Sequence, residues 1–171
     1  MRKVDVGILL ASAIKFDLNG TFSCNGNLLS GEFSAVVESG KGNAVIENIM
    51  SRRSIRKYQP QPVDRQTMDQ IAKCGINAPN GQNRQSWEVR IVDDPTLLAQ
   101  MSEAMAAAHP KMDAEMVKGM FRGAPTMAFI ARDVHYDFSS IDCGLLAENM
   151  MLSAWSLGVG SICLGGPVRF L

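Results

Sequence analysis

Residues 139–157 constrain the fold of this chain most, because they favour a helix that is apolar on nearly every side. Its apolar side chains recur around the whole helix: Ile141, Leu145, Leu146, Met150, Met151, Leu152, Ala154, Trp155 and Leu157. A helix that is hydrophobic all round must be buried all round. In a chain of 171 residues, the simplest cover is a sheet on one face and a second subunit on another. A core helix within a single chain is the alternative.

The rest of the chain from residue 44 onward alternates between helical and strand patterns. Helical signals predict helices at residues 45–50, after Asp64, after Asp94 and Pro95, and around residues 112–120. Alternating apolar and charged residues predict a half-buried strand at residues 87–91, and apolar segments predict strands at 125–131 and 159–164. With 46% hydrophobic and 20% charged residues, the chain can bury one ordinary core. We therefore expect a single α+β domain over residues 44–171.

The charge balance and the cysteines exclude several classes of partner. The net charge is zero, so no overall field holds nucleic acid or an acidic membrane surface. The four cysteines, Cys24, Cys74, Cys143 and Cys163, lack metal-ligand spacing, and only two histidines are present, so we expect no metal site. Cysteines in apolar surroundings most often act as small buried hydrophobes, and we expect this of the last three.

Residues 1–43 differ in composition from the rest of the chain. Two cations precede a short apolar run at residues 6–14, and a Gly/Asn/Ser-rich stretch follows. This resembles a secretory or lipoprotein signal over residues 1–24, although charged residues flank the run closely. The run is too short to span a bilayer as a permanent helix. We expect a signal-like or disordered segment outside the fold, in a protein that is cytoplasmic, or exported or lipid-anchored if the signal works.

Two polar segments about two dozen residues apart carry the candidate binding chemistry. Residues 51–58 concentrate cations around a serine, and residues 77–87 form a Gly/Asn loop rich in amides. Guanidinium forks match phosphate, and amides match ring oxygens and nitrogens. The pair suits a ligand that is anionic at one end and a flat, amide-edged heterocycle at the other, such as flavin mononucleotide (FMN). Taken separately, each segment also fits a solvated helix end or an ordinary loop.

Both segments resemble signature motifs of the FMN-dependent nitroreductase family. Residues 52–58 read Arg-Arg-Ser-Ile-Arg-Lys-Tyr, and residues 78–87 read Ala-Pro-Asn-Gly-Gln-Asn-Arg-Gln-Ser-Trp. In the second motif Asn80 stands in place of a serine and Ser86 in place of a proline. A weaker likeness runs from Gly123-Ala124-Pro125 through residues 141–161. The resemblance covers about residues 43–171.

The resemblance implies a nitroreductase-like three-layer α/β/α domain, with a mostly antiparallel mixed sheet flanked by helices and a long apolar central helix as the dimer contact. It implies a homodimer with FMN at the interface. The implied activity passes a hydride from NADH or NADPH through the flavin to nitroaromatic, quinone or similar electron-poor acceptors. The flavin carries this chemistry, so no catalytic side chain is required. No dinucleotide fingerprint selects between NADH and NADPH.

The resemblance also assigns roles to residues. It implies that Arg52 and Ser54 contact the phosphate and ribityl end, that Arg56 reaches the polar edge of the ring, and that Arg53 contributes through its backbone or side chain. The loop residues Pro79, Asn80, Gly81 and Asn83 would face the flavin from the other subunit, with Gln85 supporting the loop. The residues expected along one side of the ring are Cys163, Leu164, Gly165 and Gly166.

One departure from the family pattern lies at the end of the chain. Family members are expected to continue beyond the position of Leu171 with another strand, an arm over the partner subunit and a basic residue at the phosphate. This sequence does not include that segment. The alternative function is therefore a non-catalytic flavin-binding or scaffold domain, as a truncated family member.

Overall fold

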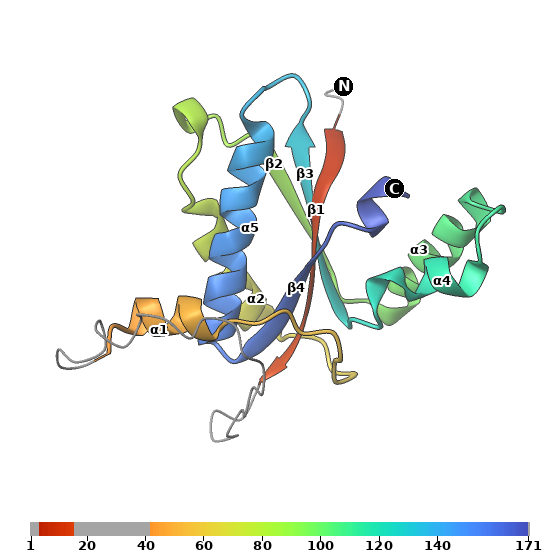
Figure 1. The fold of residues 1–171 in the computed structure, drawn as a ribbon, viewed down its shortest axis with the longest axis horizontal. Helices are drawn as coiled ribbons and strands as arrows, with labels where there is room; N and C mark the ends of the chain where they lie inside the picture. Colours follow the sequence, from red (N-terminus) through yellow and green to blue (C-terminus); the bar gives the residue numbers. More distant parts are fainter. Residues whose placement is uncertain (1–3, 16–41, 171) are drawn as a thin grey trace, which may run out of the picture.

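A four-stranded sheet forms the centre of the fold. The computed structural model describes residues 4–15 and 42–170, whose elements are shown in Figure 1. Neighbouring strands pair antiparallel, and their order across the sheet is β2 (Trp87–Val92), β3 (Thr126–Asp133), β1 (Val4–Lys15) and β4 (Val159–Leu164). The strands expected at residues 87–91, 125–131 and 159–164 are confirmed, with small differences at their ends.

The position of β1 differs from the expectation that residues 1–43 lie outside the fold. The structure places Val4–Lys15 between β3 and β4, where Leu9 is in register with Phe129 of β3 and Leu164 of β4. An apolar run of this length fits a buried strand as well as the hydrophobic part of a signal. Residues 1–3 and 16–41 lie outside the described part of the chain, and a signal at residues 1–24 stays a prediction.

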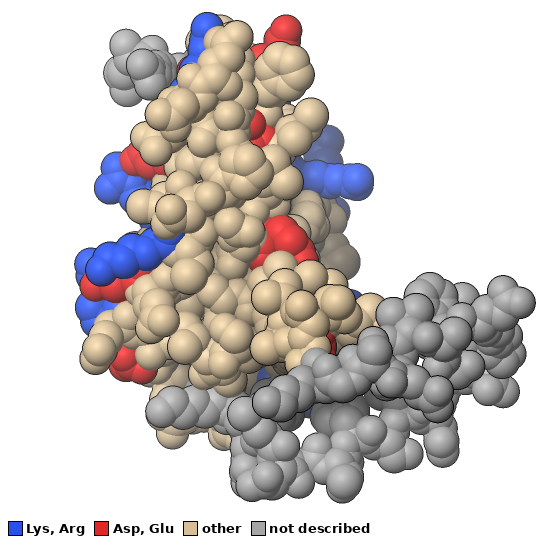
Figure 2. Space-filling model, turned by 90° about the vertical axis from the view of Figure 1, so that its left-hand side faces the viewer, with Lys and Arg blue, Asp and Glu red and all other residues tan. Residues whose placement is uncertain are grey.

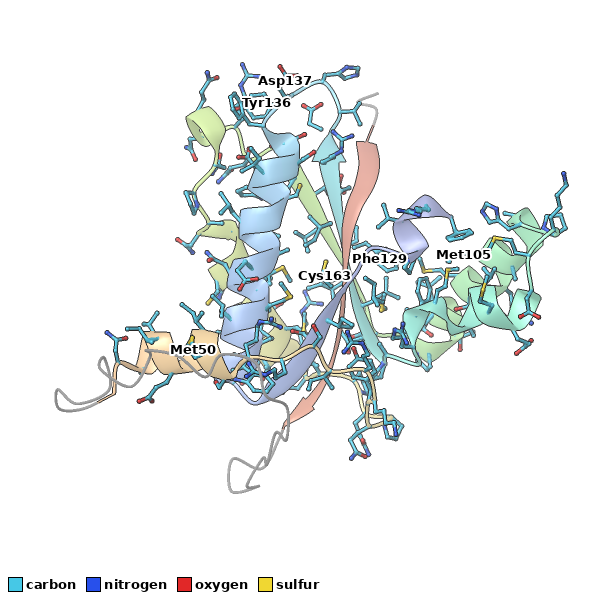
Figure 3. All side chains as sticks on the ribbon, viewed as in Figure 1. Met50, Met105, Phe129, Tyr136, Asp137 and Cys163 are labelled. Atoms are coloured by element: carbon cyan, nitrogen blue, oxygen red, sulfur yellow. The ribbon has the colours of Figure 1, made fainter. Side chains whose placement is uncertain are left out.

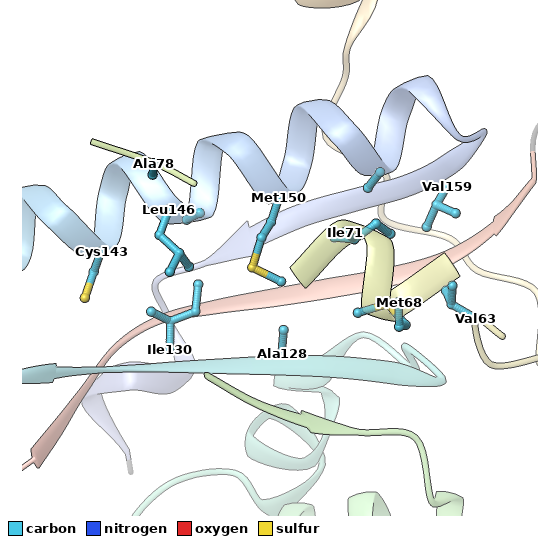
Figure 4. Packing of buried hydrophobic residues seen from close by; sticks show 12 residues of the cluster. Val63, Met68, Ile71, Ala78, Ala128, Ile130, Cys143, Leu146, Met150 and Val159 are labelled. Atoms are coloured by element: carbon cyan, nitrogen blue, oxygen red, sulfur yellow. The ribbon is translucent and has the colours of Figure 1, made fainter. Parts of the chain in front are cut away.

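Helices α2 (Arg65–Ile76) and α5 (Ser139–Ser156) cover one face of the sheet. Their side chains pack on alternate residues of β3, as Figure 4 shows. A Cβ at Gly75 of α2 would lie 2.6 Å from Cγ of Met150, so glycine lets the two helices approach closely. The buried residues of this core are Val63, Met68, Ile71, Ala78, Ala128, Ile130, Cys143, Leu146, Ala147, Met150, Ala154 and Val159.

The second face of the sheet is covered by α3 (Pro95–Ala108), α4 (Ala114–Lys118) and the 3-10 turns η2 (Gly119–Phe121) and η3 (Pro167–Arg169). Successive side chains of a strand point to opposite faces. Met127 and Phe129 of β3 therefore belong to this second core, and Phe129 meets Phe121 edge to face at 6.2 Å (Figure 3). Helices on both faces give an α/β/α arrangement with an antiparallel sheet.

Four helices begin at side-chain caps that satisfy their first free N–H groups. Asn43 caps α1 (Ala44–Ser51), and Asp64, Asp94 and Asp113 cap α2, α3 and α4. The shortest of these bonds, from the backbone N–H of Thr96 to Asp94 and from that of Met116 to Asp113, measure 2.7 Å. Each such cap contributes about 1 kcal/mol. The helices expected after Asp64 and Asp94 are confirmed.

Helix α5 confirms the helix expected at residues 139–157, but the described chain buries only one of its sides. Leu146 and Met150 are buried against the sheet, whereas Ile141 is 60% and Leu145 39% exposed. Within the described residues, no helix has the length and apolarity needed to cross a bilayer. The sequence predicted burial on every side of this helix, but a single chain leaves one side of α5 exposed.

Candidate functional site

The arginine-rich segment lies along the outer edge of β4. Ser54 forms an isolated parallel bridge with Ser161, and the N–H of Ile55 donates to the carbonyl of Ser161 at 3.1 Å. A Cβ on Gly160 would lie 2.8 Å from Cγ1 of Ile55, so the glycine lets the segment run close to the strand. This contact brings residues 52–56 to the same strand as Cys163.

Helix α1, which leads into the arginines, is fixed to the C-terminal part of α5. The side-chain amide of Asn48 donates to the carbonyl of Leu152 at 2.9 Å. The indole N–H of Trp155 donates to the hydroxyl of Ser51 at 2.8 Å. These two bonds set the position of the chain immediately before Arg52.

In the described part of the chain, the guanidinium groups of Arg53 and Arg56 donate to nearby carbonyls. Arg53 donates to the carbonyls of Met50 at 2.7 Å and Arg52 at 2.8 Å, and Arg56 donates to Ser54 at 3.3 Å. Within the described residues the ion pairs lie elsewhere, at Arg65, Arg90 and Lys118. No described carboxylate neutralises Arg52, Arg53 or Arg56, so donors remain for an anion.

Arg122 adds a further positive charge to this region, and its charge acts on Tyr58. The hydroxyl of Tyr58 donates to the carbonyl of Ile55 at 2.7 Å. Burial raises the pKa of Tyr58 to about 12, and the cations Arg122 and Arg56 oppose this rise. Arg122 is a residue that the sequence reasoning missed, because it reaches Tyr58 from a turn 64 positions further along the chain (122 minus 58). Its only local signal was the following turn, Gly123-Ala124-Pro125.

The amide-rich loop adopts an unusual backbone. It contains the 3-10 turn η1 (Gly81–Asn83), and Gln82, Asn83 and Gln85 have positive φ angles of 56°, 53° and 48°. The side-chain oxygen of Asn80 accepts from the N–H of Gln85 at 2.9 Å and so closes the loop.

Gly81 sits directly against an aromatic side chain. A Cβ at this position would come 2.2 Å from the hydroxyl oxygen of Tyr136, which is 8% exposed. On the outer side of the ring, the Arg84 guanidinium lies 4.5 Å from the ring centroid of Tyr136, within cation–π range. A side chain at residue 81 would therefore clash with Tyr136 unless one of the two moves.

The loop is tied to the first turn of α5 by Asp142. One carboxylate oxygen accepts from the N–H of Gly81 at 3.0 Å, and the other from the hydroxyl of Ser86 at 2.8 Å. Asp142 is 2% and Ser86 8% exposed. Neither residue was among the candidate site residues, because bonds spanning 61 and 56 positions have no local signal.

The expected ring-side residues follow the end of β4. Leu164 is buried in the second core, but Cys163 is exposed, so the prediction of a buried Cys163 is wrong. Side chains alternate along a strand, so Cys163 shares a face of β4 with the buried Val159 and Ser161, but it lies next to the last residue of this edge strand. Partial desolvation and nearby Glu148 raise the pKa of its thiol. Cβ atoms at Gly165 and Gly166 would meet nothing within 4 Å, so this stretch of backbone has open space beside it. Cys143 is buried, as expected, and Cys74 is partly buried.

The two halves of the candidate site lie at opposite ends of α5. The amide loop bonds to Asp142, whereas the arginine segment is held through Leu152 and Trp155. At 1.5 Å per residue, these anchors are about 15–20 Å apart along the helix. Figure 3 shows the same separation, with Tyr136 near one end of α5 and Met50 near the other. One chain therefore joins residues 52–56 with β4, but not with the loop at residues 79–85.

Comparison with known proteins agrees with both motifs. The sequence model of the nitroreductase family matches residues 49–170. This chain belongs to the nitroreductase family. The match contains the arginine segment, the amide loop and the end of β4.

Relatives of this nitroreductase-family chain carry oxidoreductase names. It is 30% identical over 125 residues to a putative NADH dehydrogenase/NAD(P)H nitroreductase of Archaeoglobus fulgidus, covering 70% of this chain and 66% of the relative. It is 29% identical over 136 residues to an FMN reductase [NAD(P)H] of Bacillus subtilis, covering 72% and 54%. The chain thus spans less than two thirds of the length of these relatives.

Solved structures support the same family fold. A nitroreductase with bound FMN from Desulfitobacterium hafniense is 33% identical, with a TM-score of 0.59, over 69% of this chain and 68% of that one. A nitroreductase with bound FMN from Bacteroides fragilis is 27% identical, with a TM-score of 0.61, over 68% and 67%. The nitroreductase-like α+β fold is therefore confirmed.

The exposed side of the nitroreductase-family fold near α1 and α5 is largely apolar. Figure 2 shows this side as mostly uncharged residues. Helix α1 buries none of its residues in the described chain. The large hydrophobic side chains exposed on the two helices are Val45, Ile46, Ile49, Met50, Ile141 and Leu145.

Proposed function

We propose that this nitroreductase-family chain binds FMN and oxidises NADH or NADPH, passing the reducing equivalents to a nitroaromatic, a quinone or a similar electron-poor acceptor. The observation that carries the proposal is the group of guanidinium donors at Arg52, Arg53 and Arg56, which no described carboxylate neutralises. The names of the FMN reductase relative and the FMN-bound structures support a flavin as the ligand.

The phosphate of FMN suits the arginine segment. Guanidinium groups bind phosphate oxygens through paired, charge-assisted hydrogen bonds. Arg52 and Ser54 would hold the phosphate and ribityl end, Arg53 would add a further donor, and Arg56 would reach the polar edge of the ring. Since the backbone of Ser54 and Ile55 is held on β4, these donors project from a segment that is fixed on the sheet edge.

The ring of FMN suits the amide loop and the end of β4. The side-chain amides of Asn80 and Asn83 would meet ring oxygens and nitrogens, Gly81 would let the backbone lie close to the ring, and Pro79 and Gln85 flank them. Cys163, Leu164, Gly165 and Gly166 would line one side of the ring, where the glycines leave open space. When bound, FMN supplies the group that accepts and releases the hydride and electrons. The chain needs only to bind this group, orient it and leave one face open.

A homodimer would unite the two halves of the site. The loop and the arginines lie at opposite ends of α5 in one chain. If two copies pack with their α5 helices antiparallel about a two-fold axis, the loop end of one helix lies beside the arginine end of the other. Each of the two equivalent sites then takes its arginines from one subunit and its amide loop from the partner.

The exposed side of α5 supports this packing. Gly144 lies on it, and a Cβ there would meet nothing within 4 Å. Glycine in a helix interior costs about 1 kcal/mol relative to alanine, and no contact among the described residues explains Gly144. A second helix packed against this side would use the space, and it would also cover Ile141 and Leu145 together with the apolar face of α1.

The first experiment is a visible absorption spectrum of the purified chain after addition of FMN and desalting, followed by anaerobic NADH or NADPH. Retained flavin that bleaches with either nucleotide supports the reductase. Retained flavin that neither nucleotide bleaches would favour the alternative, a non-catalytic flavin-binding domain. No retained flavin would contradict both. Steady-state assays with a quinone and a nitroaromatic then define the acceptor.

A further inference from the structure

Asp142 is a buried carboxylate that makes none of the contacts proposed for the flavin. It lies in the first turn of α5, 2% exposed. Its two oxygens accept one bond from the N–H of Gly81 and one from the hydroxyl of Ser86. These donors stand at the beginning and the end of residues 81–86. One side chain thus holds both ends of the amide loop.

The loop needs such support because its backbone is costly. Gln82, Asn83 and Gln85 all have left-handed φ angles, near 50°. A left-handed φ angle at a residue other than glycine costs about 1–2 kcal/mol. Such a backbone persists only where surrounding contacts fix it. The bond from Gln85 to Asn80 acts inside the loop, whereas Asp142 anchors the loop to a helix of the core.

We propose that Asp142 is a positioning residue, which holds residues 80–86 in the shape that meets the flavin ring and acts through Gly81 and Ser86. This inference rests on the proposed function, in which the loop faces the ring. With two oxygens, the Asp142 side chain can accept from both donors at once. The proposal also gives Ser86 a role, because the proline that the family motif has at this position could not donate a side-chain hydrogen bond to Asp142.

The test compares Asp142→Ala, Ser86→Ala and Asp142→Asn with the unchanged full chain. Asp142→Ala removes both anchoring bonds and should raise the Kd for FMN about 10- to 100-fold. Ser86→Ala removes one bond and should raise it about 3- to 10-fold. Asparagine can accept from Gly81 and donate to the Ser86 hydroxyl, so Asp142→Asn should stay within about threefold of the unchanged chain. Asp142→Ala combined with Ser86→Ala should bind no more weakly than Asp142→Ala alone, because the two residues share one bond.

Riboflavin, which lacks the phosphate, separates the anchor from the phosphate contacts. Asp142→Ala should weaken riboflavin and FMN by the same factor, because the loop meets the ring. Amide hydrogen exchange of the flavin-free protein gives a readout that needs no ligand. Residues 81–86 should exchange faster in Asp142→Ala, while the amides of α5 and β3 keep their protection.

Three results would overturn the inference. They are unchanged affinity for both flavins in Asp142→Ala, weakening of FMN alone, and faster exchange throughout α5 and β3, which would show a general loss of stability. If Asp142→Ala does not fold, Ser86→Ala tests the same inference, with a smaller expected increase in the Kd for both flavins. If the unchanged chain retains neither flavin, the proposed function fails, and the exchange measurement decides separately whether Asp142 holds the loop.

Discussion

Replacing Leu145 by alanine should weaken the proposed dimer and, with it, flavin binding. The Leu145 side chain is 39% exposed in the single chain, and this fraction is what a partner can still bury. Full burial of a leucine side chain contributes about 1.5–3 kcal/mol, so the 39% that is exposed corresponds to about 0.6–1.2 kcal/mol. Two-fold symmetry doubles this to about 1.2–2.4 kcal/mol, which raises the dimer Kd about 7- to 50-fold.

Leu97→Ala is the matched control for this change. Leu97 lies on α3, on the other side of the sheet, and is 43% exposed. Sedimentation over a concentration series gives the dimer Kd of each variant, and thermal melting reports their folding. The reasoning predicts weaker association for Leu145→Ala only, accompanied by loss of bound FMN at low protein concentration. Equal dimer Kd values for the two variants, or a clean monomer that still retains flavin, would refute the shared site.

Three further predictions concern single side chains. Arg52→Ala should raise the Kd for FMN about 10- to 100-fold but leave the Kd for riboflavin unchanged. Flavin fluorescence measures both Kd values, and Arg65→Ala, at an exposed arginine, is the control. Equal weakening of both flavins would contradict the phosphate role of Arg52. Gly81→Ala should weaken both flavins, because its Cβ would come 2.2 Å from the hydroxyl oxygen of Tyr136, and Tyr136→Phe should partly restore binding. Burial raises the pKa of Cys143 from 9.0 to about 11, so the folded state holds the thiol proton more tightly. Its contribution to the free energy of unfolding is complete below pH 9.0 and is lost as the pH rises to about 11. Urea unfolding should show this decline in the unchanged chain and a flatter profile in Cys143→Ala.

Much of the fold could be predicted from local sequence, because its signals act over a few residues. Asp64 and Asp94 were expected as caps because a side-chain oxygen bonds to N–H groups two or three positions later. The strand at residues 159–164 was found with its exact ends, because a mostly apolar segment follows a turn at Gly158. The arginine segment and the amide loop were found because each is a contiguous motif.

The features that sequence reasoning missed depend on contacts between distant residues. Asp142 reads as one polar residue at a helix start, and only the folded chain shows that it meets Gly81 and Ser86. Arg122 reaches the region of Tyr58 from another turn. β1 was set aside because a short apolar run after two cations fits a signal and a strand equally well. Cys163 is exposed although Val159 and Ser161 on the same face of β4 are buried, a difference that the local sequence does not reveal.

The place of β1 in the middle of the sheet also sets the order in which the chain can fold. Val6 pairs with Ala131 and Leu9 with Leu164, so 125 and 155 positions separate these partners (131 minus 6 and 164 minus 9). At a synthesis rate of about 5–20 residues per second, β1 waits about 6–25 s for β3 to be made. Contacts so distant in sequence close slowly. The first strand therefore has no sheet neighbour until β3 is made, and its second neighbour, β4, is made about 30 residues later (164 minus 133).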